Sequence, residues 1–321
     1  MNFSLKVKPF RDYWLNCSFN MIFSILTSIE PSYKVAALLN QYSYGVKQTE
    51  TPNETMFDCL ILKPMVKLGS ENFSSFFSPP QPINFKYDKN YVEYLKNLVM
   101  ERHYVTLGVD LFYWIPNSIC WNKFHWEHYS LINGFDTEKK LFYVLDENIK
   151  GYNEFEIPEQ RFLTAVQNSP LEPHGYILKL RNDICSFKFS KEEVIYNAKR
   201  LMAELNQIKQ RTFWYLNDKD FDDGHMCELI SMYVFQIVNR HIANELLFKI
   251  MSNEIHNSKI ISSLFQYCKD LQDGWIFVRN KIVRTYFVND RKKSLTEINN
   301  KCKMLFDTEN KMWDTFLSAI K

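Results

Sequence analysis

The sequence predicts an α+β domain that is followed by a second domain made of helices. Residues 16–101 show mainly helical periodicity, whereas residues 104–180 hold short runs of aromatic and β-branched residues punctuated by Gly or Pro. Helices followed by an antiparallel sheet form an α+β pattern. Helical periodicity returns after Asn182, with almost no strand signal. The chain of 321 residues is long enough for two domains, which we expect at residues 1–182 and 183–321.

The first helix is predicted to begin at Asn16 and to end before Pro31. Asn is a favoured N-cap residue, and it places Cys17 in the first turn. Apolar residues follow at helical spacing, namely Met21, Ile22, Ile25, Leu26 and Ile29. Further helices are expected at residues 35–42 and 89–101, separated by polar and proline-containing stretches.

Five predicted strands make up the sheet. They occupy residues 104–114, 127–133, 141–145, 152–157 and 175–180. A turn is expected at residues 134–140, because Gly134 directly follows the second strand. Residues 158–166 are predicted to form a short helix, because Pro158 suits a helix start.

The second domain shows helical signals throughout. Ser190 and Glu193 have the spacing of a capping box, which predicts a helix start. The clearest apolar stripe consists of Met226, Leu229, Ile230, Tyr233, Val234, Ile237 and Val238. We interpret this stripe as the core of a helical bundle or as a dimer seam.

Charge and cysteine content exclude several classes of protein. Lys plus Arg number 39 against 37 Asp plus Glu, so no basic field favours nucleic acid or an anionic membrane. No apolar run approaches the roughly 20 residues that cross a bilayer, and residues 1–14 lack the apolar core of a secretory signal. Seven cysteines without a CxxC pair disfavour a disulfide framework and a structural zinc site. We therefore expect a cytoplasmic protein with no nucleic-acid or membrane partner.

Neither a metal nor a nucleotide cofactor is expected. Residues 218–225 contain four aspartates and His225, but they lack the glycine turn and terminal glutamate of an EF-hand. A solvated acidic loop is the better interpretation of that segment. The chain has only eight glycines and no glycine-rich phosphate loop.

Cys17 is the best candidate for a chemically active residue. A thiol in the first turn of a helix meets the positive end of the helix dipole, which favours the nucleophilic thiolate. A thiolate needs a base such as histidine, and His128 starts a predicted strand. The next predicted strand runs into Asp146, and antiparallel pairing would bring that carboxylate to the imidazole to orient it. The three residues together predict a catalytic triad.

Each of these residues could also have a purely structural role. A cysteine and a distant histidine are, taken separately, more often buried structural residues. His125 lies three residues before His128 and is the alternative base, in a tryptophan-rich loop. We expect the remaining cysteines to be small buried side chains: Cys59, Cys120, Cys185, Cys227, Cys268 and Cys302.

The triad residues carry a resemblance to a known fold. Cys17 at a helix start, then His128-Tyr129 and, after four residues, Gly-Phe-Asp, then an apolar strand ending at Asp146, resembles the papain-like fold in its bacterial C39-peptidase-like branch. The chain is more similar still to the butirosin-pathway acyltransferase group, in which a papain-like domain precedes a helical domain. That resemblance covers essentially the whole chain. A papain-like amide synthase of closthioamide assembly is a further comparison.

The resemblance implies an amide-forming acyltransferase of antibiotic biosynthesis. Cys17 would take an acyl group from the thioester of an acyl or peptidyl carrier protein and pass it to an amine-bearing small molecule. His128 would be general base and acid, and Asp146 would orient it. The phosphopantetheine belongs to the carrier protein, so no resident cofactor is implied. The helical domain would contact the carrier protein, the acceptor or a second copy of the chain.

One departure from the family pattern concerns the oxyanion hole. Papain-like peptidases usually have a glutamine six residues before the cysteine, where this sequence has Arg11. Its guanidinium can donate to an oxyanion or bind a phosphate or carboxylate, although a surface ion pair is the simpler interpretation. Asn16 and Asn20 are further candidates. A cysteine peptidase, a thioesterase and a non-catalytic scaffold remain alternatives.

Overall fold

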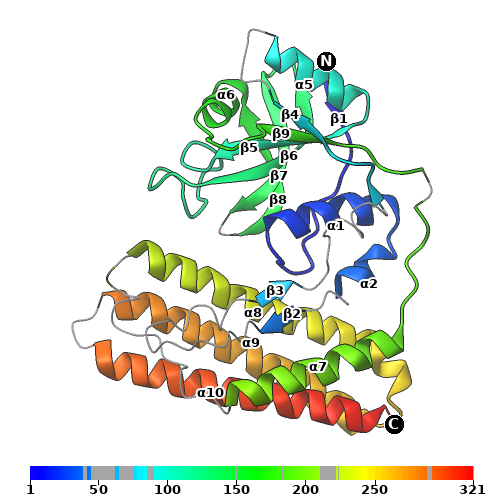
Figure 1. Cartoon of the computed structure of the whole chain (residues 1–321), viewed down its shortest axis with the longest axis vertical. Coiled ribbons are helices and arrows are strands. Elements are labelled where there is room, and N and C mark those ends of the chain that lie inside the picture. The colour runs from blue at the N-terminus through cyan, green and yellow to red at the C-terminus, as the bar shows by residue number, and fades with distance from the viewer. Residues whose placement is uncertain are drawn as a thin grey trace. The chain divides into compact units, whose positions relative to one another are not determined.

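The chain folds into two compact units. Figure 1 shows the whole chain, coloured from blue at the N-terminus to red at the C-terminus. The computed structural model describes residues 1–38, 42–44, 62–64, 76–84, 90–148, 150–182, 184–209, 222, 224–287 and 291–320. The first unit takes Met1–Lys34 and Lys67–Phe187. The second unit takes Val35–Val66 and Lys188–Lys321.

The division of the chain differs from the predicted one in one segment. The predicted boundary at residue 182 lies close to the observed division after Phe187. The sequence assigned Val35–Val66 to the first domain, whereas the structure places it in the second unit. Tyr42 shows why, because its hydroxyl donates a hydrogen bond to Glu309, 267 residues away. A contact between residues so far apart leaves no local signal in the sequence.

An antiparallel sheet forms the centre of the first unit. The strands described there are β1 (Asn2–Ser4), β4 (Gln81–Ile83), β5 (Tyr104–Asp110), β6 (Glu127–Asp136), β7 (Leu141–Asn148), β8 (Gly151–Pro158) and β9 (Gly175–Leu178). Their order is β4-β9-β5-β6-β7-β8, and β1 pairs with β6. The predicted antiparallel sheet and the α+β class are confirmed. The predicted strand at 104–114 is too long, because β5 ends at Asp110 and a loop follows.

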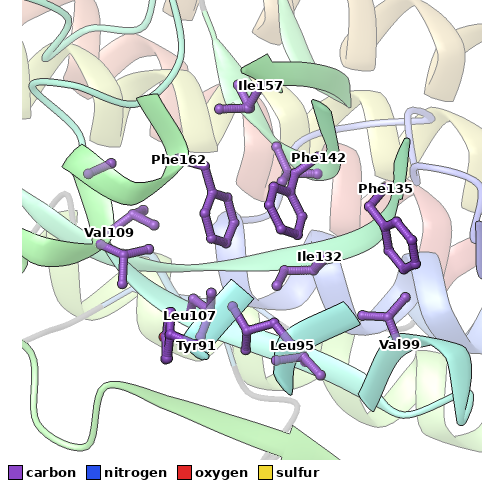
Figure 2. Close-up of a cluster of buried hydrophobic side chains, with 14 of the residues drawn as sticks. Tyr91, Leu95, Val99, Leu107, Val109, Ile132, Phe135, Phe142, Ile157 and Phe162 are labelled. Carbon is purple, nitrogen blue, oxygen red and sulfur yellow. The ribbon is translucent and has the colours of Figure 1, made fainter. Parts of the chain in front are cut away.

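Helices cover the sheet and close its core. The described helices that pack on it are α1 (Cys17–Ile29), α5 (Tyr91–Met100) and α6 (Glu159–Gln167), whereas α2 (Tyr33–Leu38) spans the division between the two units. Side chains of α5 and α6 join β5, β6 and β7 in one buried apolar cluster, in which the rings of Phe142 and Phe162 stack at 4.0 Å (Figure 2). Helix α1 packs against β6 and β7 instead. This packing brings the start of α1 to the strands that carry His128 and Asp146.

Strand β6 continues through Gly134, so the predicted turn at 134–140 begins too early. Gly134 pairs with Ser4 of β1 and, after a bulge at Asn133, with Tyr143 of β7. A Cβ atom at Gly134 would lie 2.2 Å from the carbonyl oxygen of Phe3. Glycine is therefore required here for the close approach of a neighbouring backbone and not for a turn.

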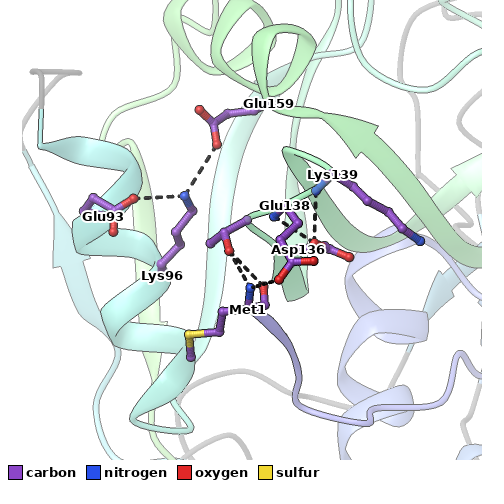
Figure 3. A network of polar contacts seen from close by, with 8 residues as sticks. Met1, Glu93, Lys96, Asp136, Glu138, Lys139 and Glu159 are labelled. Carbon is purple, nitrogen blue, oxygen red and sulfur yellow. Dashed lines mark hydrogen bonds and ion pairs between the residues drawn. The ribbon is translucent and has the colours of Figure 1, made fainter.

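The turn after β6 is fastened to the N-terminus (Figure 3). The amino group of Met1 donates to Thr137 Oγ1 at 2.8 Å and lies 3.1 Å from Glu138 Oε1. Asp136 Oδ1 accepts hydrogen bonds from the backbone N–H groups of Glu138 and Lys139. These bonds satisfy the turn locally and hold Met1, the residue before β1, beside it.

The residues after β1 connect the sheet to α1. The backbone of Val7 exchanges two hydrogen bonds with the side chain of Asn133, at 3.2 and 3.1 Å. Further along, the backbone N–H groups of Lys8 and Phe10 each donate at 2.8 Å to a serine hydroxyl of α1, Ser28 and Ser24 respectively. Residues 5–10 thus bind β6 at one end and α1 at the other.

Four long helices make up most of what the structure describes of the second unit. They are α7 (Lys191–Lys209), α8 (Gly224–Met251), α9 (Ser258–Tyr286) and α10 (Arg291–Ala319), with the short η2 (Ser252–Glu254) after α8. Helix α9 packs against α8 and α10, and α10 packs against α7. The predicted stripe on α8 is a bundle core at Ile230, Val234 and Ile237, which are fully buried. No helix in the described part of the chain is long and apolar enough to span a membrane.

The second unit also contains a strand pair, so it is not made of helices alone. Strand β2 (Tyr42–Tyr44) pairs with β3 (Leu62–Pro64). The hydroxyls of Tyr42 and Tyr44 both donate to the fully buried carboxylate of Glu309 on α10. Burial raises the pKa of Glu309 to about 7, although these bonds act in the opposite direction. The strand is therefore attached to the bundle through a buried carboxylate.

We predict that Gly134→Ala lowers the free energy of unfolding by about 1–3 kcal/mol, the usual cost of forcing atoms into a packed site. Gly108→Ala is the matched control, because its Cβ would meet side-chain atoms of Leu171 and Ser169, which can move. Urea unfolding of both variants measures the difference. An equal cost for the two substitutions would show that β1 does not constrain residue 134.

Candidate active site

Cys17 is the first residue of α1. Asn16 precedes it with an extended backbone and caps the helix, because its side-chain oxygen accepts from the backbone N–H of Phe19 at 2.8 Å. Both predictions, the N-cap and the place of the cysteine, are confirmed. The thiol is partly exposed, and its sulfur lies 4.0 Å from the Ser18 hydroxyl. The first turn of a helix is a common position for a reactive cysteine.

His128 and Asp146 meet on neighbouring strands. The Nε2 atom of His128 on β6 lies 2.9 Å from Oδ2 of Asp146 on β7. The carboxylate is 1% exposed, and the histidine side chain 13%. The indole of Trp114 donates to Asp146 Oδ2 at 2.7 Å, and the backbone N–H of Glu147 donates to Oδ1 at 2.7 Å. Asp146 is thus held by its own hydrogen bonds and fixes the orientation of the imidazole.

The imidazole connects Asp146 to the thiol. Burial alone would lower the pKa of His128, but the charge and hydrogen bond of Asp146 outweigh it, and Cys17 adds a hydrogen bond and a charge in the same direction. The pKa of His128 is therefore raised well above its ordinary value. Because Nε2 faces Asp146, the nitrogen left for the sulfur is Nδ1. The structure brings the three predicted triad residues together.

Glu147 is a site residue that sequence reasoning missed. It follows Asp146 on β7, so the two carboxylates point to opposite faces of the strand. Glu147 accepts a hydrogen bond from the indole N–H of Trp14, three residues before Cys17. Burial raises the pKa of Glu147, and the charge of His128 opposes this shift. The only signal in the sequence was a second acidic residue at the end of an apolar strand.

Tyr152 on β8 is the second residue that sequence reasoning missed. Its register partner is Glu147, and its hydroxyl donates to the backbone oxygen of Leu145 at 3.2 Å. Burial raises the pKa of Tyr152 well above its ordinary value, and the charges of Asp146 and Cys17 add to this. Tyr152 is therefore a neutral, buried neighbour of the triad. A tyrosine in a strand has many packing roles, so the sequence gave no reason to select it.

Asn20 is not an oxyanion donor, contrary to the sequence-based expectation. Its side-chain oxygen accepts from the backbone N–H of Leu15 at 2.7 Å. Its amide nitrogen donates to the backbone oxygens of Phe10 and Tyr13, both at 3.1 Å. Both N–H donors are used in this way, and the residue is 1% exposed. Asn20 shapes the loop that leads to Cys17.

Arg11 and Asn16 keep donors that could face a ligand. Arg11 is exposed on the loop before α1, and within the described ranges it forms no ion pair. The neighbouring Asp12 pairs instead with Lys34 at 2.9 Å. Asn16 uses its oxygen for the helix cap, which leaves its amide N–H groups for other contacts. Roles for both residues in oxyanion or substrate binding stay predictions.

The alternative base, His125, belongs to a different pair. Its Nδ1 lies 2.6 Å from Oδ2 of the buried Asp110, and its ring stacks on Phe112 at 4.5 Å. In the β5–β6 register Val109 faces His128, so Asp110 points to the opposite face of the sheet. The His125 side chain is 64% exposed. His128 is therefore the one of these two histidines that interacts with Cys17.

The other cysteines differ from Cys17 in their surroundings. Cys120, Cys227, Cys268 and Cys302 are buried as predicted, and burial raises the pKa of Cys302 to about 12. Cys185 is exposed, which corrects the prediction for that residue, because it lies in the extended segment before α7. Cys59 lies outside the described residues.

Metal binding has no structural support in the described ranges. No group of three or more His, Cys, Asp or Glu side chains there could hold an ion. Most of the acidic segment 218–225 lies outside those ranges, and Asp222 pairs with Arg291 at 2.9 Å. The absence of a resident cofactor stays a prediction. Comparisons with models of protein families and with curated proteins find no match for this chain.

We predict that the contribution of the His128–Asp146 pair to stability falls as pH rises. The folded pKa of His128 is raised above the unfolded value of about 6.5. The stabilisation is therefore fully present below about pH 6.5 and is lost as pH rises through the folded pKa. The free energy lost on His128→Gln, measured in a Cys17→Ser background by urea unfolding, should shrink from about pH 6 to pH 10. His256→Gln is the control, because His256 is exposed and forms no ion pair among the described residues. A constant loss for His128→Gln would contradict the pairing.

We predict that Glu147→Ala costs about 1–3 kcal/mol of unfolding free energy, because it leaves the buried indole N–H of Trp14 without an acceptor. Glu147→Gln should cost less, because the amide oxygen can still accept that bond. Denaturant unfolding distinguishes the two variants. If Gln and Ala cost the same, Glu147 does not hold the loop before Cys17.

Proposed function

We propose that the first unit is a papain-like cysteine acyltransferase that transfers an acyl group from a thioester to an amine. One observation carries the proposal. The Cys17 thiol lies at the start of a helix and interacts with His128, whose other ring nitrogen is fixed by the buried Asp146. Such an arrangement suits nucleophilic catalysis at a carbonyl carbon.

The first half of the reaction forms an acyl-enzyme. The Cys17 thiolate attacks the thioester carbonyl, and the carbonyl oxygen becomes an oxyanion. The carbon–sulfur bond to the carrier then breaks, and protonated His128 gives its proton to the departing thiolate. The raised pKa of His128 supports this step, because it favours the proton-bearing form in the resting enzyme. The products are acyl-Cys17 and the free carrier thiol.

The second half transfers the acyl group to an amine. A neutral amine attacks the acyl carbon, and the now neutral His128 accepts the proton from its nitrogen. The bond to Cys17 breaks, which releases the amide and restores the thiolate beside protonated His128. Asp146 supports both halves, because a fixed carboxylate stabilises the imidazolium in either one. A thioester is already activated, so the reaction requires no nucleotide.

Backbone and loop groups are the candidates for oxyanion stabilisation. The N–H of Cys17 lies in the first helical turn, where backbone donors lack an intrahelical acceptor. Arg11 is a second candidate from the same loop. Asn20 is excluded by its three hydrogen bonds to that loop.

The donor in this proposal is an acyl or peptidyl carrier protein, and the acceptor is an amine-bearing small molecule. The setting that follows is antibiotic or other specialised-metabolite biosynthesis in the cytoplasm, including non-ribosomal peptide assembly. These assignments rest on the resemblance of the Cys17, His128 and Asp146 motifs to the butirosin-pathway group. Hydrolysis of the same acyl-enzyme is the second candidate function, because Cys17 is partly exposed and water can reach it.

We predict that incubation with acyl-loaded carrier proteins adds one acyl mass to the native protein and none to Cys17→Ala. Cys185→Ala, which removes an exposed cysteine, should still be acylated. Intact-mass spectrometry measures the adduct and its discharge after addition of amines. Discharge by amine with formation of the amide supports the acyltransferase.

Two other outcomes would favour the rival functions. Discharge by water at the same rate with and without amine would identify a thioesterase or peptidase. No adduct with any thioester donor would favour a non-catalytic scaffold.

A further inference from the structure

Glu147 has one carboxylate oxygen to which no residue of the described ranges donates a hydrogen bond. Its Oε2 accepts a hydrogen bond from the indole of Trp14. Its Oε1 is not among the buried side-chain atoms that lack a partner, so solvent reaches this oxygen. Glu147 also forms no ion pair with any residue that the structure describes. The residue therefore presents an open acceptor to the solvent.

Glu147 lies beside the reacting groups. Trp14, which holds its Oε2, is three residues before Cys17. Burial raises the pKa of Tyr152, and the negative charges of Cys17 and Glu147 add to this shift, so both lie near the tyrosine hydroxyl. Burial also raises the pKa of Glu147, and the charge of His128 opposes that shift. These interactions place the carboxylate next to the thiol and its base.

The charges at the site become unbalanced once the proposed acyl-enzyme forms. Before that step the Cys17 thiolate is balanced by protonated His128, which Asp146 holds from its other side. Acylation removes the charge of the sulfur, and His128 gives its proton to the departing thiolate. Asp146 and Glu147 then remain as two carboxylates, and Arg11, the exposed cation of the loop before α1, pairs with neither of them. A site in this state attracts a positively charged group.

We propose that Oε1 of Glu147 binds the acceptor amine as its ammonium ion and takes the first of the two protons that its nitrogen must lose. The inference rests on the proposed function and names the class of its acceptor, an amine that is positively charged in water. An N–H bond of the ammonium ion breaks, and an O–H bond forms on Glu147. The neutral amine then attacks acyl-Cys17, and His128 accepts the second proton. Water removes the proton from Glu147 after the amide has left.

The surroundings of Glu147 suit both steps. A carboxylate whose pKa is raised by burial accepts a proton from an ammonium ion more readily than an exposed carboxylate does. A charged donor also forms a stronger hydrogen bond to a carboxylate than a neutral donor such as water does. Glu147 therefore favours transfer to an amine over hydrolysis of the same acyl-enzyme.

Two thiol reagents of different charge test the site without any acyl transfer. Aminoethyl methanethiosulfonate is a cation and methyl methanethiosulfonate is neutral. The ratio of their rates at Cys17 is measured in the full chain by peptide mass spectrometry, with the exposed Cys185 as internal reference. Glu147→Gln, which can still accept the bond from Trp14, should lower this ratio at Cys17 by about threefold or more. Glu156→Gln, at an exposed position on β8, is the matched control and should leave the ratio unchanged.

Two amines of different charge test the role in acyl transfer. Ethylamine is mostly an ammonium ion at neutral pH, whereas methoxyamine is mostly neutral. Each amine discharges acyl-Cys17 formed from an acyl thioester, and the ratio of the two rates is compared between variants. Glu147→Gln should lower the ratio of ethylamine to methoxyamine by about tenfold or more, because only the ammonium ion requires the carboxylate. A displaced Cys17 would slow both amines alike and would leave the ratio unchanged.

The outcomes separate this inference from the proposed function. If amides still form but either ratio stays the same in Glu147→Gln, the inference is overturned and the acyltransferase stands. An equal fall in Glu156→Gln would also overturn the inference, because surface charge in general would then be responsible. If no acyl-enzyme forms but Glu147→Gln lowers the thiosulfonate ratio, the result supports a cation-binding Glu147 and contradicts the acyltransferase.

Discussion

The hydrogen bonds that fasten residues 5–15 to β6 and to α1 are the constraint on which the candidate site depends. Cys17 and His128 are 111 positions apart in the chain, so their contact requires α1 to be held beside the sheet. Asn133, at the bulge of β6, binds the backbone of Val7. Asn20 binds the loop from Phe10 to Leu15, which leads directly to Cys17. Two buried asparagines therefore position the start of the helix.

The two carboxylates at the end of β7 each hold a different side chain of the candidate site in place. Asp146 fixes the imidazole of His128, and Glu147 fixes the indole of Trp14 in the loop before the thiol. Successive residues on a strand point to opposite faces, so one dipeptide reaches both partners of the site. Asp146 is buried and Glu147 is partly buried, and both are hydrogen-bonded, which is the condition under which a protein tolerates a charge away from water.

Much of this site could be predicted from local sequence features. Asn16 signals a helix cap because its side chain acts within one turn, and the antiparallel pairing of His128 and Asp146 follows from two adjacent strands. Gly134, Glu147 and Asn20 were misread or missed for a common reason. Their roles depend on Phe3, Trp14 and the loop at Phe10, and nothing near them in the sequence indicates those contacts.

The second unit also contains a contact between distant residues that local sequence features do not predict. Glu309 reads as one acidic residue on an amphipathic helix, yet it is fully buried and accepts hydrogen bonds from Tyr42 and Tyr44. A buried carboxylate of this kind specifies where β2 attaches to the bundle, and it explains why Val35–Val66 belongs to this unit. Helical periodicity predicted the bundle, but not the strand that it holds.

If His128 activates Cys17, this activation is measurable as the rate of thiol alkylation. The native protein and His128→Ala would be treated with iodoacetamide at neutral pH, and modification would be followed at each cysteine by peptide mass spectrometry. We expect Cys17 to react faster than the exposed Cys185 in the native protein and to lose this advantage in His128→Ala, while the rate at Cys185 stays the same. Equal rates at Cys17 and Cys185 in the native protein would contradict an activated thiol.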